Sequence, residues 1–351
     1  MIQTFSSTIR RKEMDAVLTC MVDEKTGPGE LNTRFIQAVK EFTGCDGAVA
    51  FRSTTLALSY ALKALDFQSG QGIMVSALAP SWQYQAVENL GFKPIVLDVA
   101  EETGLVTAEA VEKGMHEGGR LLLLHETMGI LPDFDAISAL GLPIIEDISH
   151  AVGAVRSQTQ EDGNGVIEKK AGSFGVYTIM GLEEYDTITA GGGAVLMAPS
   201  RREWIVLKKY TDTAPRTDIL PDINSALAFV QIKEYARNEE IRKKLYGVFQ
   251  HALLSGKNKT FIREPDTGST IWSFPVVLGG SFKDAKQYAS RKEIEIRPAY
   301  ADSVMALHEE ALSASCIHAK SLFLRTVLFP LYPRLTNDSA TKITKVLGTL
   351  P

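Results

Sequence analysis

The sequence has few cysteines and no long apolar run. Its 351 residues include three cysteines, Cys20, Cys45 and Cys316, scattered without the spacing of a zinc site. An odd, sparse count excludes a disulfide framework and favours a reducing cytoplasm, with each thiol a small core residue. No run approaches the roughly 18 apolar residues of a membrane span, and the first 22 residues lack the apolar core of a signal peptide.

A surplus of positive charge is also absent. Lys and Arg number 37 against 42 Asp and Glu, which gives a formal net charge of -5. We therefore expect no nucleic-acid partner, because there is no basic excess to neutralise phosphates. The basic run at residues 10–12 is followed at once by Glu13 and Asp15, and is typical of a solvated helix face.

What the sequence does contain is a regular alternation of short apolar runs and helical patterns. Strands followed by helices of this length predict right-handed crossovers and a mainly parallel sheet covered by helices on both faces. The apolar runs are continuous rather than alternating, as expected for strands buried on both sides. The predicted strands are residues 48–51, 72–76, 94–98, 121–125 and 143–147, and the predicted helices between them are 56–65, 82–90, 108–116 and 134–140.

The composition and length predict two domains of an α/β protein. Hydrophobic residues make up 45% and charged residues 23% of the chain, which is ordinary globular composition. A long helical pattern at 224–249 leaves the large domain, and apolar runs at 269–277 and 294–297 predict strands of a smaller α/β layer. We place a large domain at 1–235, including helices near 12–22 and 32–42, and a small C-terminal domain at 236–351.

Polar side chains follow several of the predicted strands, where ligands of parallel sheets gather. They are Ser53–Thr55, Ser81–Tyr84, His125 and Asp147–His150. The hydroxyl-rich turn at 53–55 opens a helix and could hold a phosphate, although serine and threonine are also the commonest helix caps.

A glycine-rich stretch, residues 172–198, has two apolar runs at 176–180 and 194–197. A polar bend and the triple glycine 191–193 join them, which predicts a β-hairpin. Polar residues 157–165 predict another exposed hairpin or loop.

Taken in order, eight segments resemble the DegT/DnrJ/EryC1/StrS sugar aminotransferases, a family of fold-type I enzymes that use pyridoxal phosphate (PLP). Any single segment would be a weak signal, but the order and spacing cover nearly the whole chain. The segments are GCDGAVAFRSTTLALSYALKAL, GFKPIVLDVAEETG, LLLLHETMGILPDFDAISAL, LPIIEDISHAVGA, KAGSFG, GGGAVL, NSALAFVQIKEYARNEEIRKKLY and FPLYPRLTNDSATKI.

The resemblance implies roles for several residues. Asp147 matches the carboxylate that pairs with the pyridine nitrogen of the cofactor, although a strand-end cap would look the same. His150 falls near the cofactor hydroxyl, or is structural, and His125 matches the His of the HLYG segment. The remaining matches are Thr54 and Thr55 at the phosphate, Trp82 or Tyr84 at the ring face (core packing is the alternative), and Arg297 and Tyr300 near the substrate entrance.

The main departure from the family is the missing catalytic lysine. No Lys or His occurs from Ala171 to Ser200, and the expected lysine position holds Tyr185 or Asp186, depending on the register. Neither side chain can form an imine with an aldehyde. Tyr185, Glu183 or Glu184 could act as a substitute base, and Lys208 or Lys209 could reach the ring from elsewhere.

Two further departures affect the phosphate end of the site. Residues 217–220 replace the Asn-x-Arg element with which the partner subunit completes the site, and Thr54 replaces a glycine. We therefore expect a degenerate member that binds a PLP-like, pyridoxamine phosphate (PMP)-like or nucleotide-sugar ligand without a covalent bond and does not perform lysine-based transamination. The alternative is a PMP-dependent nucleotide-sugar-modifying enzyme, aminotransferase or dehydratase-like, with a non-lysine base. The resemblance also implies a homodimer, and no metal is expected.

Overall fold

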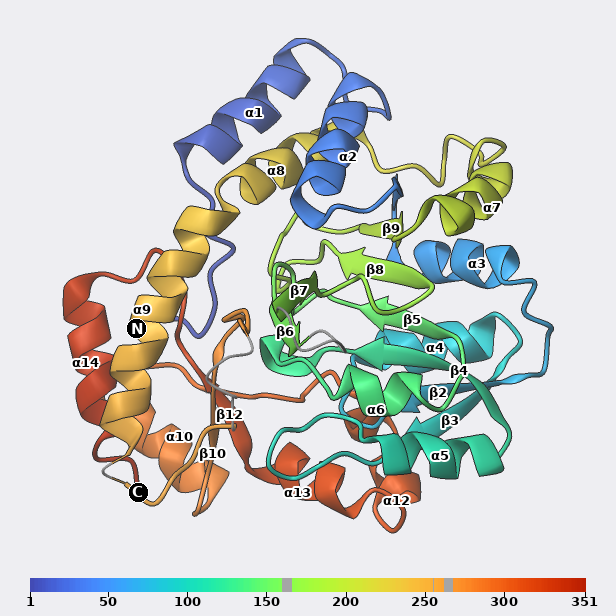
Figure 1. Cartoon of the computed structure of the whole chain (residues 1–351). Coiled ribbons are helices and arrows are strands. Elements are labelled where there is room, and N and C mark those ends of the chain that lie inside the picture. Colours follow the sequence, from blue (N-terminus) through green and yellow to red (C-terminus); the bar gives the residue numbers. More distant parts are fainter. Residues whose placement is uncertain (160–165, 255, 262–267) are drawn as a thin grey trace.

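The computed structural model describes residues 1–159, 166–254, 256–261 and 268–351, and Figure 1 shows the elements. In these residues the main sheet has seven strands, and the five from β8 to β3 are parallel, whereas β9 runs antiparallel to both of its neighbours, β8 and β1. The predicted mainly parallel sheet is confirmed. Its order is β1 (Gly47–Phe51), β9 (Ala194–Ala198), β8 (Tyr177–Gly181), β5 (Ile144–Asp147), β4 (Gly119–His125), β2 (Gly72–Ser76) and β3 (Lys93–Leu97).

Alternate side chains of the central strands enter two separate cores. Leu121 and Leu123 of β4 pack with helices on one face, whereas Leu122 and Leu124 pack on the other. This burial on both faces explains the continuous apolar runs. The first core includes residues of α3 (Thr54–Ala64), α4 (Ser81–Asn89) and α7 (Arg201–Thr211), and the second those of α2 (Glu30–Thr43), α5 (Ala108–His116), α6 (Phe134–Ser138) and α8 (Asp222–Lys233).

The predicted long helix at 224–249 is wrong as a single element, because it is two helices. α8 ends at Lys233 and α9 (Tyr235–Leu253) begins beyond Glu234, whose φ of -90° and ψ of 0° interrupt the regular geometry. Glu234 accepts a hydrogen bond from Lys12 Nζ at 2.6 Å. Lys12 belongs to α1 (Arg11–Val22), which packs with α2 against α8 at the top of Figure 1.

The C-terminal part is built on a smaller antiparallel sheet of β10 (Phe274–Val277), β12 (Thr326–Phe329) and β11 (Arg297–Pro298). The strands predicted at 269–277 and 294–297 are therefore too long. The Ile271 amide donates a hydrogen bond to the Glu239 carboxylate at 2.8 Å, and Ile294 forms an isolated bridge with Ile2. A third core lies among this sheet, α9, α10 (Phe282–Arg291) and α14 (Asn337–Leu347).

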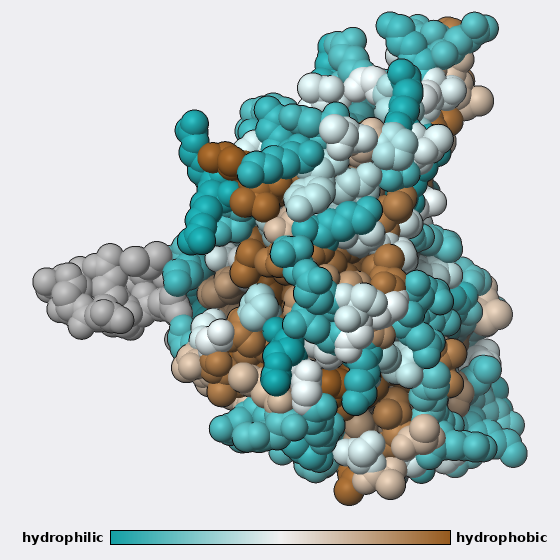
Figure 2. All heavy atoms as spheres, turned by 90° about the vertical axis from the view of Figure 1, so that its right-hand side faces the viewer, coloured by the Kyte–Doolittle hydropathy of each residue, from teal (hydrophilic) through white to brown (hydrophobic). Residues whose placement is uncertain are grey.

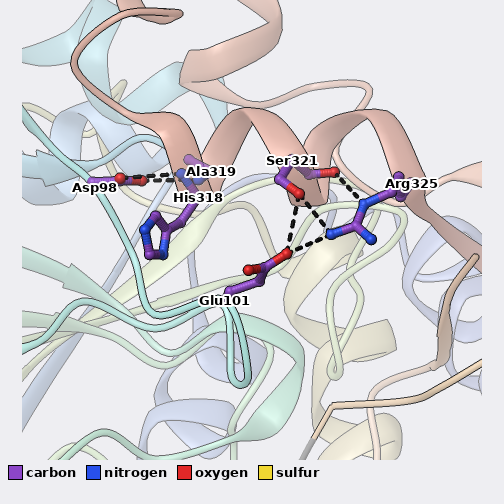
Figure 3. Close-up of polar contacts among 6 residues, drawn as sticks. All are labelled: Asp98, Glu101, His318, Ala319, Ser321 and Arg325. Atoms are coloured by element: carbon purple, nitrogen blue, oxygen red, sulfur yellow. Dashed lines mark hydrogen bonds and ion pairs between the residues drawn. The ribbon is translucent and has the colours of Figure 1, made fainter. Parts of the chain in front are cut away.

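Polar contacts join the C-terminal part to the loop after β3 (Figure 3). Asp98 accepts hydrogen bonds from the amides of His318 and Ala319, at 3.2 and 2.8 Å, and so caps α13 (Ile317–Arg325) from 220 residues away. Glu101 binds Arg325 at 2.5 Å and Ser321 at 3.1 Å. Side chains of both parts also share one apolar core, and the predicted division after residue 235 stays a prediction.

The predicted hairpin at 172–198 is confirmed as β8 and β9, which pair in antiparallel register. Of the polar excursion at 157–165, residues 157–159 belong to β6 (Val155–Thr159), which pairs in antiparallel register with β7 (Val166–Lys170). Residues 160–165 are outside the described part of the chain. All three cysteines are buried and free.

The surface is mixed. Figure 2 shows one side of the molecule, where hydrophilic residues cover the upper and lower parts and hydrophobic residues gather in the middle. Among the described residues, no helix combines the length and apolar character that crossing a membrane requires.

The Asp98 cap predicts a measurable loss of stability. Asp98→Ala should lower the free energy of unfolding by about 1 kcal/mol, because two amides of α13 lose their acceptor. Denaturant unfolding of Asp98→Ala measures the loss, and Glu102→Ala, at an exposed acidic position of the same loop, is the control. Equal loss in both variants would contradict the capping role.

Candidate active site

A cavity of about 370 Å³ opens at the carboxyl ends of β4 and β5, between the main sheet and the C-terminal part. The main sheet and the segments that follow its strands contribute Thr54, Trp82, His125, Thr127, Ser149 and His150. The C-terminal part contributes Trp272, Arg297 and Tyr300, and the N-terminal residues Thr4 and Phe5 line the same cavity together with Tyr185 and Asp186.

Most of the predicted site residues thus meet at one cavity, but Thr55, Tyr84 and Asp147 are not among its described lining residues. Trp82 and Tyr84 lie two positions apart on α4, so their side chains leave the helix on different faces. Tyr84 packs on His308, with ring centroids 4.3 Å apart, and lines a second cavity of about 380 Å³. Ser53 caps α3 by accepting from the Leu56 amide at 3.2 Å, which is the plain capping role of this turn.

Asp147 carries a fully buried carboxylate that four hydrogen bonds satisfy. One oxygen accepts from Gln83 Nε2 at 2.8 Å and from His125 Nδ1 at 3.0 Å. The other accepts from the Ser149 amide at 3.1 Å and from the Ser149 hydroxyl. Burial by itself raises the pKa of Asp147, but His125 and Ser149 outweigh it and lower the pKa to about 2. The carboxylate is therefore ionised at neutral pH.

His150 is a neutral imidazole in the wall of the cavity. Burial lowers its pKa well below the ordinary value, and the neighbouring His125 lowers it further. Its ring stacks on Trp272, with centroids 3.7 Å apart, and meets His125 edge to face at 4.7 Å. His150 Nδ1 is buried without a hydrogen-bond partner, as is Thr127 Oγ1. Two unsatisfied polar atoms in one cavity wall favour a polar ligand there.

The bend after β8 brings Tyr185 and Asp186 to the cavity in different ways. Tyr185 is 44% exposed, packs edge to face on Phe5 at 4.8 Å, and accepts from an Arg297 guanidinium nitrogen at 3.3 Å. Asp186 turns inward over Gly181, where a side chain on the glycine would collide with the carboxylate. Burial raises the pKa of Asp186 to about 7, and the charges of Asp147 and Glu183 act in the same direction. The hydrogen bond that Asp186 accepts from the Glu183 amide has the opposite effect and lowers the pKa.

No lysine is among the described residues that line the cavity. Lys208 and Lys209 lie in the last turn of α7, and Lys208 pairs with Asp212 at 4.0 Å. Lys170 donates to the Phe42 carbonyl at 2.7 Å. Arg297 is the one cationic side chain in the lining that the structure describes, and Glu295 pairs with it at 3.0 Å.

The segment at 217–220, where the family's Asn-x-Arg element is expected, lies against β1. Ile219 forms a bridge with Phe51, and Asp218 accepts from the Tyr60 hydroxyl at 2.9 Å. Burial and the Asp218 carboxylate raise the pKa of Tyr60 to about 12. These contacts give the segment a structural role within this chain.

Several residues of the site have no clear signal in the sequence. Thr127 and Trp272 reach it only because the turn after β4 and the segment before β10 converge. Gln83 belongs to the polar residues 81–84 of the sequence, but its contact with Asp147 follows from the position of α4. Glu146 lies on the opposite side of β5 from the cavity, where it accepts from the amides of Gly172 and Phe174 at 2.8 and 2.7 Å. It thereby fixes the turn that leads into β8.

Known proteins resemble this chain both in sequence and in structure. A sequence model of the DegT/DnrJ/EryC1/StrS aminotransferase family matches residues 7–348. The aminotransferase TlmJ from Streptoalloteichus hindustanus has a similar structure, with a TM-score of 0.86 and 17% identity over 99% of this chain and 98% of that one. E. coli GDP-4-keto-6-deoxy-D-mannose-3-dehydratase with bound hydrated PLP has a TM-score of 0.81 and 16% identity over 99% of both chains.

Asp186 predicts a pH dependence of stability. The folded protein keeps the Asp186 proton up to about pH 7, whereas the unfolded chain releases it near the ordinary pKa of 3.8. The unfolded state therefore binds fewer protons in this window, and stability falls as pH rises from about 4 to 7. Asp147 has no effect on this slope above about pH 5, where its carboxylate is ionised in both the folded and the unfolded state.

Asp186→Asn should reduce this slope, to which the raised pKa values of Glu126 and Glu146 also contribute. It should gain about 2 kcal/mol relative to the parent protein between pH 4 and 7, allowing for solvent screening of a half-buried group. Denaturant unfolding at several pH values measures the change, with Glu184→Gln at an exposed neighbouring position as the control. A slope that is unchanged in Asp186→Asn would contradict the raised pKa.

Proposed function

Because this chain belongs to the DegT/DnrJ/EryC1/StrS aminotransferase family, we propose that it is a degenerate member that binds its ligand without a covalent bond. The observation that carries the proposal is the absence of lysine, both from residues 171–200 and from the described lining of the cavity. A phenol or a carboxylic acid in place of the amine cannot form an imine, so lysine-based transamination is lost.

The residues of the cavity fit a phosphorylated pyridoxal or pyridoxamine held non-covalently. His150 Nδ1 and Thr127 Oγ1 are buried, unpaired and available to ligand hydroxyl or amino groups. Trp82 and Trp272 offer flat apolar surfaces, and Thr54 stands at the first turn of α3, where amide groups favour an anion. When bound, such a group supplies an electron-withdrawing aromatic ring. A nucleotide sugar is the other ligand class, and a related dehydratase structure contains GDP-perosamine.

One observation favours the alternative, a PMP-dependent enzyme that modifies a nucleotide sugar with a non-lysine base. Asp186 lines the cavity with a pKa of about 7, so it can accept and return a proton near neutral pH. Tyr185 is less suitable, because its ring packs on Phe5 and its hydroxyl accepts from Arg297. The similar structure of a sugar dehydratase supports this alternative.

We also propose a homodimer located in the cytoplasm. Met14, Leu18, Met21 and Val22 lie on one face of α1 at helical spacing, and each is more than half exposed. An exposed apolar stripe of this kind suits a second copy of the chain. Three free, buried cysteines suit a reducing compartment.

The loss of imine chemistry is tested with PLP and borohydride. The parent protein should show no covalently fixed cofactor after reduction. Asp186→Lys should restore a reducible imine, because this side chain points inward beside Gly181, whereas Tyr185→Lys should restore less, because Tyr185 points toward Phe5. Absorption spectra and peptide mass measure the fixation. Stoichiometric fixation by the parent protein in its cavity would overturn the proposal.

The homodimer is tested by Leu18→Lys, which places a charge in the apolar stripe. Light scattering should show a dimer for the parent protein and a shift of at least tenfold in its dissociation constant for the variant. Lys12→Ala, at the edge of the same helix, is the control for a general effect on α1. A monomeric parent protein would contradict this proposal.

A further inference from the structure

We propose that residues 5–8, which we call the N-terminal wall, form a hinged side of the ligand cavity, and that Phe5 limits the size of the ligand that the closed cavity admits. Phe5 lines the cavity of about 370 Å³, and all four residues line a smaller cavity of about 30 Å³ beside it. Phe5, Asp186 and Trp272 line both cavities, so they form the partition between them. The inference rests on the proposed function only in that a ligand of cofactor size occupies the larger cavity.

The wall is anchored at both ends. Before it, the Ile2 carbonyl accepts from the Glu295 amide at 2.9 Å. The Thr4 amide donates to the Glu295 carboxylate at 2.9 Å, and the Thr4 hydroxyl donates to the Glu295 carbonyl at 3.0 Å. After it, Arg334 donates to the Ile9 carbonyl at 2.8 Å. These bonds fix the two ends, so movement is confined to the residues between them.

Between its anchors the wall has few contacts. No backbone hydrogen bond joins it to the rest of the chain that the structure describes. The Ser7 hydroxyl donates to the Glu184 carbonyl at 3.5 Å and the Ser7 carbonyl accepts from Gln231 at 3.4 Å, and both distances lie at the weak limit of hydrogen bonding. The Phe5 ring packs edge to face on Tyr185, with centroids 4.8 Å apart. A segment held by so few bonds opens at a low cost in free energy.

Thr8 is a strained residue within the wall. Its φ of 55° lies in the left-handed region, which a β-branched side chain rarely adopts. Its amide donates to the Ser6 hydroxyl at 3.2 Å, and its hydroxyl donates to the Ser6 carbonyl at 3.3 Å, so these two bonds stay within the wall. Strain in a loosely held segment favours a second arrangement in which it is released, which makes Thr8 the hinge.

The surface on which the wall closes is held more firmly. The Tyr185 carbonyl accepts from Trp272 Nε1 at 2.6 Å, and the Tyr185 hydroxyl accepts from Arg297 at 3.3 Å. With the wall closed, the cavity volume lies near the lower end of ordinary ligand sites, which begin at about 300 Å³. A phosphorylated pyridoxamine is of this size, whereas a nucleotide sugar is much larger and needs the space that Phe5 occupies.

The first experiment measures opening of the wall in the ligand-free protein. Hydrogen exchange of the Trp272 indole N–H reports how often its buried bond to Tyr185 is exposed, and NMR of protein labelled at its three tryptophans, assigned with Trp272→Phe, follows it. Phe5→Ala should accelerate this exchange about fivefold, because the ring packed on Tyr185 is lost. Phe5→Leu keeps an apolar side chain and should stay closer to the parent protein. Equal exchange in Phe5→Ala and the parent protein would overturn the proposal.

The hinge is tested by a matched pair of variants with the same readout. Thr8→Gly should slow the indole exchange about fivefold, because glycine adopts a positive φ without strain and so stabilises the closed wall. Ser7→Gly places a glycine at the neighbouring residue, which is not among the described residues with a positive φ, and should not slow the exchange. Unchanged or faster exchange in Thr8→Gly would contradict the hinge.

The second experiment compares the affinity for PMP with that for phosphopyridoxyl-leucine, which has the same ring and a bulkier substituent on its amine. Titration calorimetry should show that the parent protein prefers PMP by about tenfold and that Phe5→Ala loses most of this preference, with Phe5→Leu between them. An unchanged preference in Phe5→Ala would overturn the size limit. If the parent protein binds neither ligand, the proposed function fails, and the indole exchange still decides whether the wall opens.

Discussion

The buried charge of Asp147 is the constraint on which the rest of the site depends. A carboxylate without solvent contact is tolerated only when hydrogen-bond donors replace water around it. Those donors come from α4, from the end of β4 and from the turn after β5, so three segments must converge on one point. Ser149 extends the network by accepting from the Gly181 amide at 2.8 Å, which ties the end of β8 to the same centre.

This network holds the family scaffold together without a lysine between residues 171 and 200. The strands, the turn held by Glu146 and the glycine bend are fixed by hydrogen bonds and packing that do not involve a lysine. The cavity therefore keeps its walls without an amine at this bend. What remains is a pocket with an imidazole, a carboxylic acid of raised pKa and stacked aromatic rings.

Sequence patterns predicted the main sheet because its strands are buried on both faces, and such strands have a strong apolar signal. They failed where tertiary contacts override local pattern. The helix across Glu234 is broken, although nothing in its apolar spacing predicts the break. Of the strand expected at 294–297, only Arg297 belongs to β11, whereas Ile294 forms an isolated bridge with the N-terminal residue Ile2. Of the two aromatic candidates on α4, only Trp82 lines the cavity, since the rotation of the helix directs Tyr84 to His308.

By itself, the sequence determined the α/β architecture, the family and the absence of an amine between residues 171 and 200, because periodicity, motif order and residue identity are local properties. Only the tertiary structure decided which polar groups meet. It placed Gln83, His125 and Ser149 around Asp147, turned Asp186 inward and Tyr185 outward, and brought Trp272 onto His150. These contacts join residues up to 122 positions apart in the chain, and their geometry follows from how the helices and strands pack.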